Sequence, residues 1–341
     1  MPAGGPYRLS VETATGAAQA IDDVLIGDVW LCSGQSNMEF KVRQGLNALY
    51  DAPTLVSDRV RLLTVAHDAA PRPLGGFRTA PSWTAATADA VPDFSAACLY
   101  MARELRARDP APIGLIDASW GGSAIDVWRS EEAIAAAPFD RAGDLALLRR
   151  YRTDPAAAYR EWGARWERWW RTQPGAAADP APWATPAATA GWPRVPGPGP
   201  WESWGDPSLA TFNGLAWFAT EATLTPDQAS RPATLALGRV EDLDMAWVNG
   251  VPVGAAYGPD LNRSYRLAPG VLKPGVNRIV VNVWDGWGDG GLTGGRDARS
   301  LRWDDGSSVT LPDAGWRYKF AAGGGEPIRP PWDQLEGVAT T

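Results

Sequence analysis

The stretch Gly34-Gln35-Ser36-Asn37-Met38 follows the apolar run Val29-Trp30-Leu31-Cys32 after a single residue. An apolar run that breaks at a glycine and then presents a serine is typical of a buried strand that displays a hydrolase nucleophile at its end. The motif is not Gly-x-Ser-x-Gly, because Met38 stands at the place of the second glycine, so the elbow of the larger α/β-hydrolases is not implied. Helix N-capping is the other role that Ser36 can take at such a position.

The residues around this stretch alternate between strand-like and helix-like patterns. Strands are predicted over residues 6–12, 23–31, 61–65 and 112–118, and a helix over 95–108. The end of the 23–31 strand is continuously apolar, which is typical of a strand in the centre of a sheet. Strands that alternate with helices predict an α/β fold with a parallel sheet and helices on its faces.

The middle of the chain is rich in tryptophan, which occurs 19 times in the sequence. We expect residues 135–175 to be largely helical. Four tryptophans fall there at helical spacing and are interpreted as the apolar face of an amphipathic helix. They are Trp162, Trp166, Trp169 and Trp170.

Residues 175–200 are rich in Ala, Pro and Gly and are interpreted as a linker or a long surface loop. Trp183, Trp192 and Trp201 lie in this kind of sequence. Because the flat face of an indole ring packs well on the C–H face of a sugar, these three residues remain candidate carbohydrate contacts.

Beyond residue 200 the pattern changes to short strand-like runs separated by turns. The runs cover residues 215–220, 233–237, 245–248, 264–267 and 278–283. The pair Asn249-Gly250 is typical of a hairpin turn, and Gly/Pro pairs separate the other runs. Short strands with such punctuation predict an antiparallel β-sandwich. Residues 321–341 show no strand or helix pattern of their own.

The predicted sandwich contains acidic side chains that a Ca²⁺ site or a sugar site would need, including Asp242, Asp244 and the loop 285–291. A Ca²⁺ site takes about 6–8 converging oxygens, and the spacing fits no EF-hand loop. Structural roles are therefore favoured for these residues, and no metal site is predicted.

Composition excludes several function classes. Charged residues make up 21% of the chain, the net charge is −7 and the basic residues are scattered, so no nucleic-acid partner is indicated. No run approaches the roughly 18 apolar residues of a membrane span, and residues 1–20 lack the pattern of a secretory signal.

The two cysteines, Cys32 on a predicted strand and Cys98 on a predicted helix, make no disulfide framework and are interpreted as small buried apolar residues.

Three stretches together resemble the sialate O-acetylesterase-like branch of the SGNH (GDSL-type) hydrolases. Residues 23–39 resemble the nucleophile block of that family, residues 113–123 with Trp128 resemble its glycine block, and residues 213–319 are similar to its inserted β-sandwich. The resemblance implies a partial SGNH-type parallel α/β/α sheet followed by a galactose-binding-like jelly roll. The implied domains are 1–22 as the remnant of a β-rich lead-in region, 23–200 as the N-terminal part of the hydrolase domain, 201–320 as the sandwich and 321–341 as a return linker.

The resemblance also implies chemistry: hydrolysis of acetyl esters on carbohydrates, of the sialate 9-O-acetylesterase type, without cofactor or metal. Ser36 would be the nucleophile, and Gly121 or Gly122 would give a backbone N–H to the oxyanion beside the N–H of Ser36. A tight turn that requires glycine is the alternative explanation for Gly121 and Gly122. Gln35 and Asn37 are predicted to bind substrate or to hold the loop through local hydrogen bonds.

The family places an oxyanion Asn and an Asp-x-x-His pair after the sandwich, and neither appears in this sequence. We therefore expect a fragment of a longer protein that is inactive by itself. His67 is the single histidine and the only candidate base by residue type, but it follows a predicted strand and is interpreted as a solvated loop residue. A non-catalytic carbohydrate-binding protein or an inactive esterase relative is the alternative function. The family suggests a periplasmic or extracellular location.

Overall fold

The structure is a computed structural model that describes residues 2–138, 140–197, 199–259, 261–295 and 298–335. It contains two compact units, of which the first ends at Ser130 and the second spans Glu131–Leu335. The division expected from composition lies at residue 200. The boundary of the units lies earlier, because helices between residues 131 and 170 pack on the sandwich that follows them.

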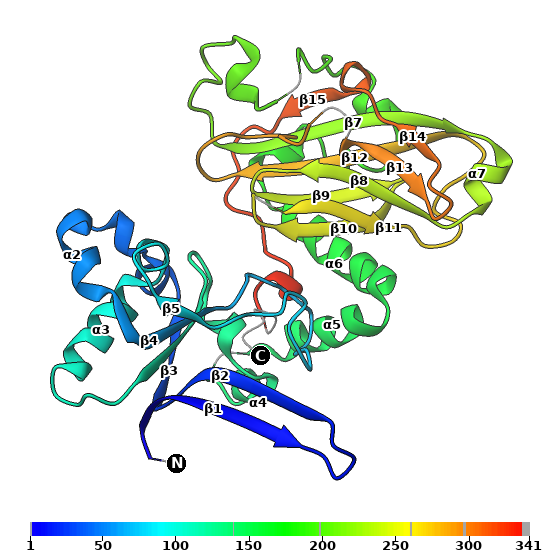
Figure 1. Cartoon of the computed structure of the whole chain (residues 1–341). Coiled ribbons are helices and arrows are strands. Elements are labelled where there is room, and N and C mark those ends of the chain that lie inside the picture. Colours follow the sequence, from blue (N-terminus) through cyan, green and yellow to red (C-terminus); the bar gives the residue numbers. More distant parts are fainter. Residues whose placement is uncertain (1, 139, 198, 260, 296–297, 336–341) are drawn as a thin grey trace. The chain divides into compact units, whose positions relative to one another are not determined.

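The first unit contains a hairpin and a four-stranded sheet (Figure 1). In the hairpin, β1 (Gly4–Glu12) pairs antiparallel with β2 (Ala18–Ile26). In the sheet the strand order is β3-β6-β4-β5. The strands are β3 (Asp28–Gly34), β4 (Ser57–Thr64), β5 (Thr84–Ala86) and β6 (Ile113–Ser119). Strands β3, β6 and β4 are parallel, as predicted, and β5 adds an antiparallel edge.

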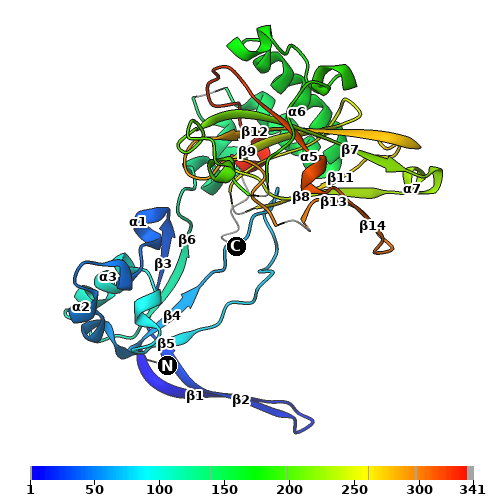
Figure 2. The same cartoon turned by 90° about the horizontal axis from the view of Figure 1, so that it is seen from above.

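Helices α1 (Ser36–Glu39), α2 (Ala48–Leu55) and α3 (Ala96–Arg106) pack on one face of this sheet (Figure 2). Alternate strand residues such as Cys32, Leu62 and Leu115 point into this core, since side chains along a strand alternate between faces. Cys32 on β3 and Cys98 on α3 meet there as a disulfide, with their Cα atoms 6.2 Å apart. Both cysteines are buried, but the interpretation that they are unpaired apolar residues was wrong. They are 66 residues apart in the sequence, and the sequence alone does not reveal that the strand and the helix pack together.

The strand predicted over 23–31 is in fact two strands that meet at Gly27. A Cβ at Gly27 would lie 1.9 Å from the carbonyl oxygen of Pro112, which already accepts the N–H of Asp28 at 3.0 Å. The chain therefore turns at this glycine from the hairpin into the sheet. Among the described strands β3 lies at an edge of its sheet rather than in the centre, and Val29 and Leu31 are more than 60% exposed.

The second unit is built on two antiparallel sheets, of five strands in the order β10-β9-β12-β7-β15 and of four strands in the order β11-β8-β13-β14. The strands are β7 (Gly214–Leu224), β8 (Ala233–Arg239), β9 (Leu243–Val248), β10 (Val251–Tyr257), β11 (Asn262–Arg266), β12 (Gly275–Asp285), β13 (Ser300–Trp303), β14 (Ser308–Thr310) and β15 (Arg317–Phe320). Residues from both sheets share one apolar core, so the predicted β-sandwich is present. At the β9–β10 turn, Asn249 and Gly250 have φ of 52° and 79°, which suits the predicted Asn-Gly hairpin turn.

The described residues of the second unit form the α-helices α4 (Glu131–Ala135), α5 (Ala142–Thr153), α6 (Pro155–Trp170) and α7 (Pro226–Ser230). Short 3₁₀ turns in the two units lie at Val42–Gln44, Val91–Asp93, Ile125–Trp128, Pro174–Ala177, Pro186–Thr189, Trp201–Trp204, Asp313–Gly315 and Pro331–Asp333. Helix α6 begins at Pro155, where the side chain of Asp154 accepts the N–H of Ala157 at 3.0 Å. Its predicted aromatic face is buried, with Trp162, Trp166 and Trp170 at most 3% exposed.

The tryptophans after α6 are buried as well, which contradicts their interpretation as sugar contacts. Trp183, Trp192 and Trp201 are 4%, 5% and 0% exposed. Trp183 stacks on Trp247 of strand β9 with ring centroids 5.2 Å apart, so the stretch 175–200 covers the outer face of the sandwich rather than linking two domains. The aromatic composition of this region is explained by packing.

The acidic residues of the sandwich have structural partners or crowd one another. Asp244 is fully buried, pairs with Arg263 at 2.7 Å and accepts the hydroxyl of Tyr265 at 2.7 Å. Asp285, at the end of β12, is buried beside Asp242 and Glu202, and one of its carboxylate oxygens has no hydrogen-bond partner among the described residues. No group of three His, Cys, Asp or Glu side chains among the described residues could hold a metal ion.

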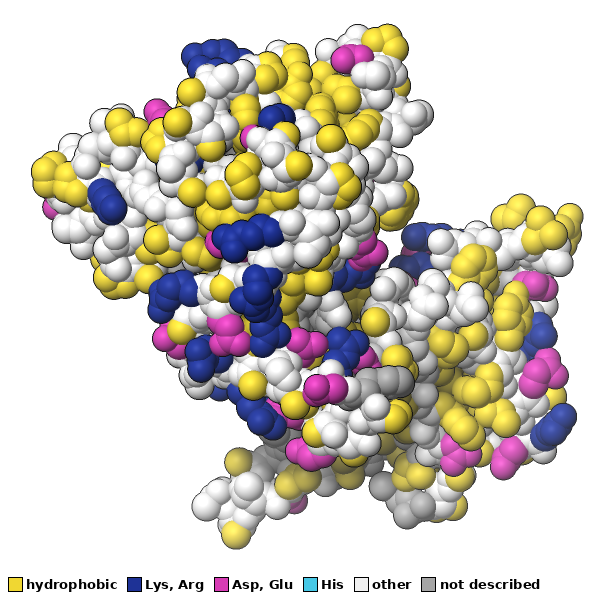
Figure 3. All heavy atoms as spheres, turned by 180° about the vertical axis from the view of Figure 1, so that it is seen from behind, with side chains coloured by type: hydrophobic (Ala, Val, Ile, Leu, Met, Phe, Trp, Pro, Cys, Tyr) yellow, Lys and Arg dark blue, Asp and Glu magenta, His cyan; other side chains and the backbone are white. Residues whose placement is uncertain are grey.

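Hydrophobic side chains reach the surface in patches (Figure 3), and Leu46, Leu49 and Tyr50 of the first unit are more than 80% exposed. Within the described residues, every helix is too short or too polar to cross a membrane.

The contact between α6 and β10 predicts opposite effects for two glycine-to-alanine changes. A Cβ at Gly163 would lie 2.3 Å from Cγ of Pro252, whereas a Cβ at Gly143 in α5 would meet only a guanidinium nitrogen of Arg165 at 3.7 Å. We expect Gly163→Ala to destabilise the chain by about 1–3 kcal/mol through overpacking. Gly143→Ala should stabilise it by up to about 1 kcal/mol through helix propensity. Urea unfolding followed by circular dichroism tests both, and equal effects of the two changes would contradict the packing of α6.

The buried carboxyl of Asp285 predicts a pH dependence of stability. Burial, with the nearby Asp242 and Glu202 carboxylates, raises the pKa of Asp285 to about 7. The folded chain thus keeps a proton that the unfolded chain releases near pH 4, and the associated stability, complete below about pH 4, is lost as the pH rises to about 7. We expect Asp285→Asn to flatten the fall of Tm between pH 5 and 8. Asp304→Asn, which removes an exposed carboxylate, is the control and should leave the slope unchanged.

Candidate active site

Ser36 lies at the first position of α1, directly beyond the end of β3. The N-cap of this helix is Gln35, whose side chain accepts the N–H of Ser36, so Ser36 is not the capping residue. Gly34 has φ of +142°, a conformation that other residues rarely adopt, and a Cβ there would lie 2.9 Å from Cγ of Met38. The sharp turn from strand to helix leaves Ser36 exposed at the carboxyl end of the sheet.

A buried serine fixes the far end of this short helix. Ser95 is fully buried at the start of α3, and its Oγ donates to the carbonyl oxygen of Met38 at 2.6 Å. The N–H of Ala96 donates to the carbonyl oxygen of Phe40 at 2.8 Å. Helix α1 is therefore held between β3 and α3, and the position of Ser36 follows from that anchorage.

The glycine block lies beside Ser36 because β3 and β6 are parallel neighbours whose carboxyl ends meet. The pairing runs to Gly34 opposite Ser119, and the N–H of Trp120 continues it by donating to the carbonyl oxygen of Gly34 at 2.9 Å. A Cβ at Gly121 would lie 3.6 Å from Cα and Cβ of Ser36. The structure therefore brings together two stretches that are about 85 residues apart in the sequence.

The N–H groups of the two glycines point to different acceptors. The N–H of Gly121 donates to Oε2 of Glu39 at 2.6 Å. The N–H of Gly122 faces Oε1 of Gln35 at 3.4 Å, and the N–H of Ser36 donates to that same oxygen at 2.8 Å. Gly122 thus shares an acceptor with Ser36, whereas Gly121 is engaged elsewhere. Gly122 has φ of +78°, so its turn also requires glycine.

Glu39 is a member of the site that sequence analysis did not single out. It lies three residues after Ser36, one helical turn along α1, and that spacing was the only signal in the sequence. Its Oε2 accepts the N–H of Gly121, and its Oε1 lies 3.1 Å from Nε2 of His67. One carboxylate therefore connects the helix of Ser36, the glycine block and the histidine.

His67 is more constrained than a solvated loop residue, although its side chain is 42% exposed. Its ring stacks on Trp120 with centroids 4.4 Å apart, and its Nε2 lies 3.0 Å from the carbonyl oxygen of Ser119 as well as near Glu39. Both neighbours of Nε2 are acceptors, so Nε2 carries a hydrogen and, in the neutral ring, Nδ1 is the basic nitrogen. The polar contacts of His67 are thus with Glu39 and Ser119 rather than with Ser36.

A buried acid supports the end of β6 below the glycine block. Asp117 is 7% exposed, and its Oδ1 accepts the hydroxyl of Ser119 at 2.5 Å and the N–H of Ser119 at 3.2 Å. Burial raises the pKa of Asp117 above its usual range, and the Glu39 carboxylate adds to this. The arrangement fixes the backbone from which the glycine block begins.

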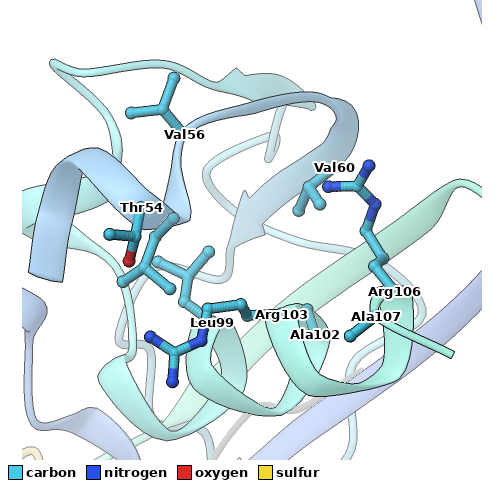
Figure 4. A pocket seen from close by; sticks show the side chains of 9 residues that line it. Thr54, Val56, Val60, Leu99, Ala102, Arg103, Arg106 and Ala107 are labelled. Carbon is cyan, nitrogen blue, oxygen red and sulfur yellow. The ribbon is translucent and has the colours of Figure 1, made fainter. Parts of the chain in front are cut away.

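Asn37 and a cavity of the first unit do not contribute to this site. Asn37 is exposed in the first turn of α1. The residues that line a cavity of about 190 Å³ in the first unit include Leu55, Val60, Leu99 and Arg106. Figure 4 shows the side chains of Val60, Leu99 and Arg106 there. None of the residues that line the cavity belongs to the candidate site.

The environments of the two glycines predict a difference that a double-mutant cycle can measure. A Cβ at Gly121 would lie 2.6 Å from Oε2 of Glu39, whereas one at Gly122 meets nothing within 4 Å. We expect Gly121→Ala to cost about 1 kcal/mol of stability, because the end of the Glu39 side chain has to move off the Gly121 N–H, and Gly122→Ala about 1–2 kcal/mol by its left-handed backbone. In a Glu39→Ala background only the cost of Gly121→Ala should shrink. Urea unfolding of the unmodified chain, the three single variants and the two double mutants checks this, and equal coupling of both glycines to Glu39 would contradict the geometry.

Comparison with known proteins gives partial matches. The chain is 35% identical over 158 residues to the sialate O-acetylesterase of Rattus norvegicus, a match that covers 43% of this chain and 29% of the rat protein. For the sialate O-acetylesterase of Homo sapiens the identity is 33% over 155 residues, covering 42% of this chain and 30% of the human protein. No family model matches the chain.

Among solved structures, a carbohydrate acetylesterase from Xanthomonas citri matches at 35% identity with a TM-score of 0.37, over 39% of this chain and 31% of that one. Each match spans less than a third of the relative concerned. Over the matched part, the resemblance to sialate O-acetylesterases that the motifs indicated is confirmed.

Proposed function

We propose that this chain carries the nucleophile and the oxyanion donors of a carbohydrate O-acetylesterase of the SGNH type. One observation supports this above the others: an oxygen atom, Oε1 of Gln35, lies 2.7 Å from Oγ of Ser36, 2.8 Å from the N–H of Ser36 and 3.4 Å from the N–H of Gly122. In a tetrahedral adduct the oxyanion is bonded to the same carbon as the attacking Oγ, so it lies close to Oγ and needs N–H donors around it. The backbone at Ser36 and Gly122 offers that environment.

The proposed reaction has two steps. Oγ of Ser36 forms a bond to the acetyl carbon, the bond between that carbon and the sugar oxygen breaks, and the sugar oxygen takes up the proton that left Ser36. Water then attacks the acetyl-serine, which releases acetate and restores the hydroxyl of Ser36. The N–H groups of Ser36 and Gly122 stabilise the negative oxygen in both steps, and such a donor is typically worth about 10²–10³ in rate.

The base that takes the proton of Ser36 is, in this proposal, not His67. The Nε2 of His67 faces Glu39 and the carbonyl oxygen of Ser119, and its ring is held by stacking on Trp120. His67 and Glu39 are proposed to position the glycine block instead. The proton acceptor would come from outside this chain, in keeping with the expectation that the chain by itself hydrolyses no ester.

The substrate class follows from the relatives, which are named sialate O-acetylesterase and carbohydrate acetylesterase. We propose an acetylated carbohydrate, with a 9-O-acetylated sialic acid as the first candidate. The alternative of a non-catalytic carbohydrate-binding protein loses its main support in this structure, because Trp183, Trp192 and Trp201 are buried in the packing of the second unit.

Chemical labelling tests the proposed nucleophile without requiring turnover. The chain is incubated with a fluorophosphonate at pH 7 to 9, with and without added imidazole as an external base, and the modified residue is located by mass spectrometry. We expect labelling at Ser36 that imidazole and higher pH accelerate at least tenfold, because deprotonation of the hydroxyl limits the reaction.

Two variants serve as controls for this labelling. Ser36→Ala should lose the adduct, and His67→Ala should keep it within about twofold. Labelling of the exposed Ser33 at the same rate as Ser36 would remove the case for a nucleophile. Loss of labelling in His67→Ala would instead identify His67 as the base.

A further inference from the structure

The side chain of Gln35 folds back onto the residue that follows it. Its Oε1 accepts three hydrogen bonds, from Oγ of Ser36 at 2.7 Å, from the N–H of Ser36 at 2.8 Å and from the N–H of Gly122 at 3.4 Å. Both N–H groups can only donate, so the atom between them must be the amide oxygen and not the amide nitrogen of Gln35. The orientation of the amide is therefore fixed by its partners.

This arrangement is not required by the loop itself. Gln35 is exposed, and water could satisfy each of its partners. The helix N-cap needs only one acceptor, whereas this oxygen also reaches Gly122, which is 87 residues away in the sequence. The three donors have one property in common: they are the nucleophile and the two oxyanion donors of the proposed reaction.

We propose that Gln35 is an internal occupant of the oxyanion site: its side-chain carbonyl lies where the acyl oxygen of a substrate must lie, and it has to rotate away before an ester can bind. This inference rests on the proposed function and adds a resting state to it. A carbonyl oxygen is the same kind of acceptor as the ester oxygen that replaces it, so the exchange conserves the hydrogen bonds of Ser36 and Gly122. Gln35 also holds the hydroxyl hydrogen of Ser36, so the closed state keeps the nucleophile protonated.

In this proposal Gln35 competes with ligands for the site and thereby weakens their binding. When an internal group competes with a ligand, the apparent Kd of the ligand is its intrinsic Kd divided by the fraction of molecules in which the site is open. Shortening the side chain removes the competitor while leaving the backbone donors in place. A residue that merely orients Ser36 would give the opposite result, because its removal would lower the reactivity of Ser36.

Two measurements on the whole chain test this with Gln35→Ala and Gln35→Glu. The first is titration with sodium acetate, followed through the amide resonances of Ser36 and Gly122, with acetate as the probe for the oxyanion donors. We expect Gln35→Ala to bind acetate at least fivefold more tightly than the unmodified chain. Gln35→Glu should bind it more weakly, because its carboxylate keeps the site filled and repels an anion.

The second measurement is the rate of fluorophosphonate labelling at Ser36, which we expect to rise at least fivefold in Gln35→Ala and to fall in Gln35→Glu. Gln44→Ala is the matched control, since Gln44 is an exposed glutamine whose Oε1 accepts the N–H of Lys41 at 2.8 Å, outside the site. It should change neither quantity. Circular dichroism establishes that each variant is folded.

The outcomes separate this inference from the proposed function. Tighter acetate binding in Gln35→Ala, without labelling of Ser36 in any variant, would support Gln35 as an occupant of the oxyanion site. The same result would contradict Ser36 as the nucleophile. If Ser36 is labelled at one rate in all variants, or more slowly in Gln35→Ala, Gln35 does not occupy the oxyanion site. The proposal that Ser36 is the nucleophile would be unaffected by that result. An absence of any acetate response at Ser36 and Gly122 in every variant would also overturn the occupant.

Discussion

The parallel pairing of β3 with β6 is the constraint on which the candidate site depends. It places Gly34 opposite Ser119, so the turn that carries Ser36 and the glycine block leave the sheet side by side at the same edge. The hydrogen bond from Trp120 to Gly34 carries the pairing one residue beyond the strands. Because parallel strands are joined by long crossover connections, this proximity comes from segments that are far apart in the sequence.

Glycine is needed at this edge for two different physical reasons. A Cβ at Gly121 would lie only 2.6 Å from Oε2 of Glu39, although it would be at ordinary contact distance from Ser36. Gly122 has ample room but a positive φ. The first glycine allows the two loops to approach, and the second turns the chain so that its N–H faces the acceptor beside Ser36. The tight turn and the orientation of the Gly122 N–H toward that acceptor are therefore two consequences of one backbone path.

Patterns over a few neighbouring residues were enough to predict several strands and one turn of this structure. The strands ending near Cys32 and Ala118, and the turn at Asn249-Gly250, follow from apolar runs and turn residues, which act over a few positions. Strand β10 was missed because Pro252 and Gly254 interrupt its pattern, although its partner β9 fixes the register. Local sequence also predicted a serine after a strand, but not which backbone donors would meet it.

The features that could not be predicted all depend on contacts between distant segments. The pairing of Cys32 with Cys98, the burial of Trp183 on the sandwich and the role of Glu39 each require knowledge of which surfaces meet. Tryptophan in a Pro/Gly-rich stretch is ambiguous for this reason, since stacking on a sugar and packing on a sheet use the same apolar face. Only burial decides between them, and burial is a property of the fold.

Gln35 and Glu39, at the two ends of α1, accept different backbone N–H groups at this edge of the sheet. Glu39 takes the N–H of Gly121, while Gln35 takes those of Ser36 and Gly122. A carboxylate makes a stronger, charge-assisted hydrogen bond than a neutral amide does, so the bond to Glu39 is the stronger one and the bonds to Gln35 are easier to replace. In the proposed reaction, the bonds that an ester oxygen replaces are therefore the weaker ones. In the proposed reaction, a carboxylate in place of the Gln35 amide would repel the charge that develops on the acyl oxygen, and an amide in place of the Glu39 carboxylate would hold the glycine block less firmly, so the two residues are not interchangeable.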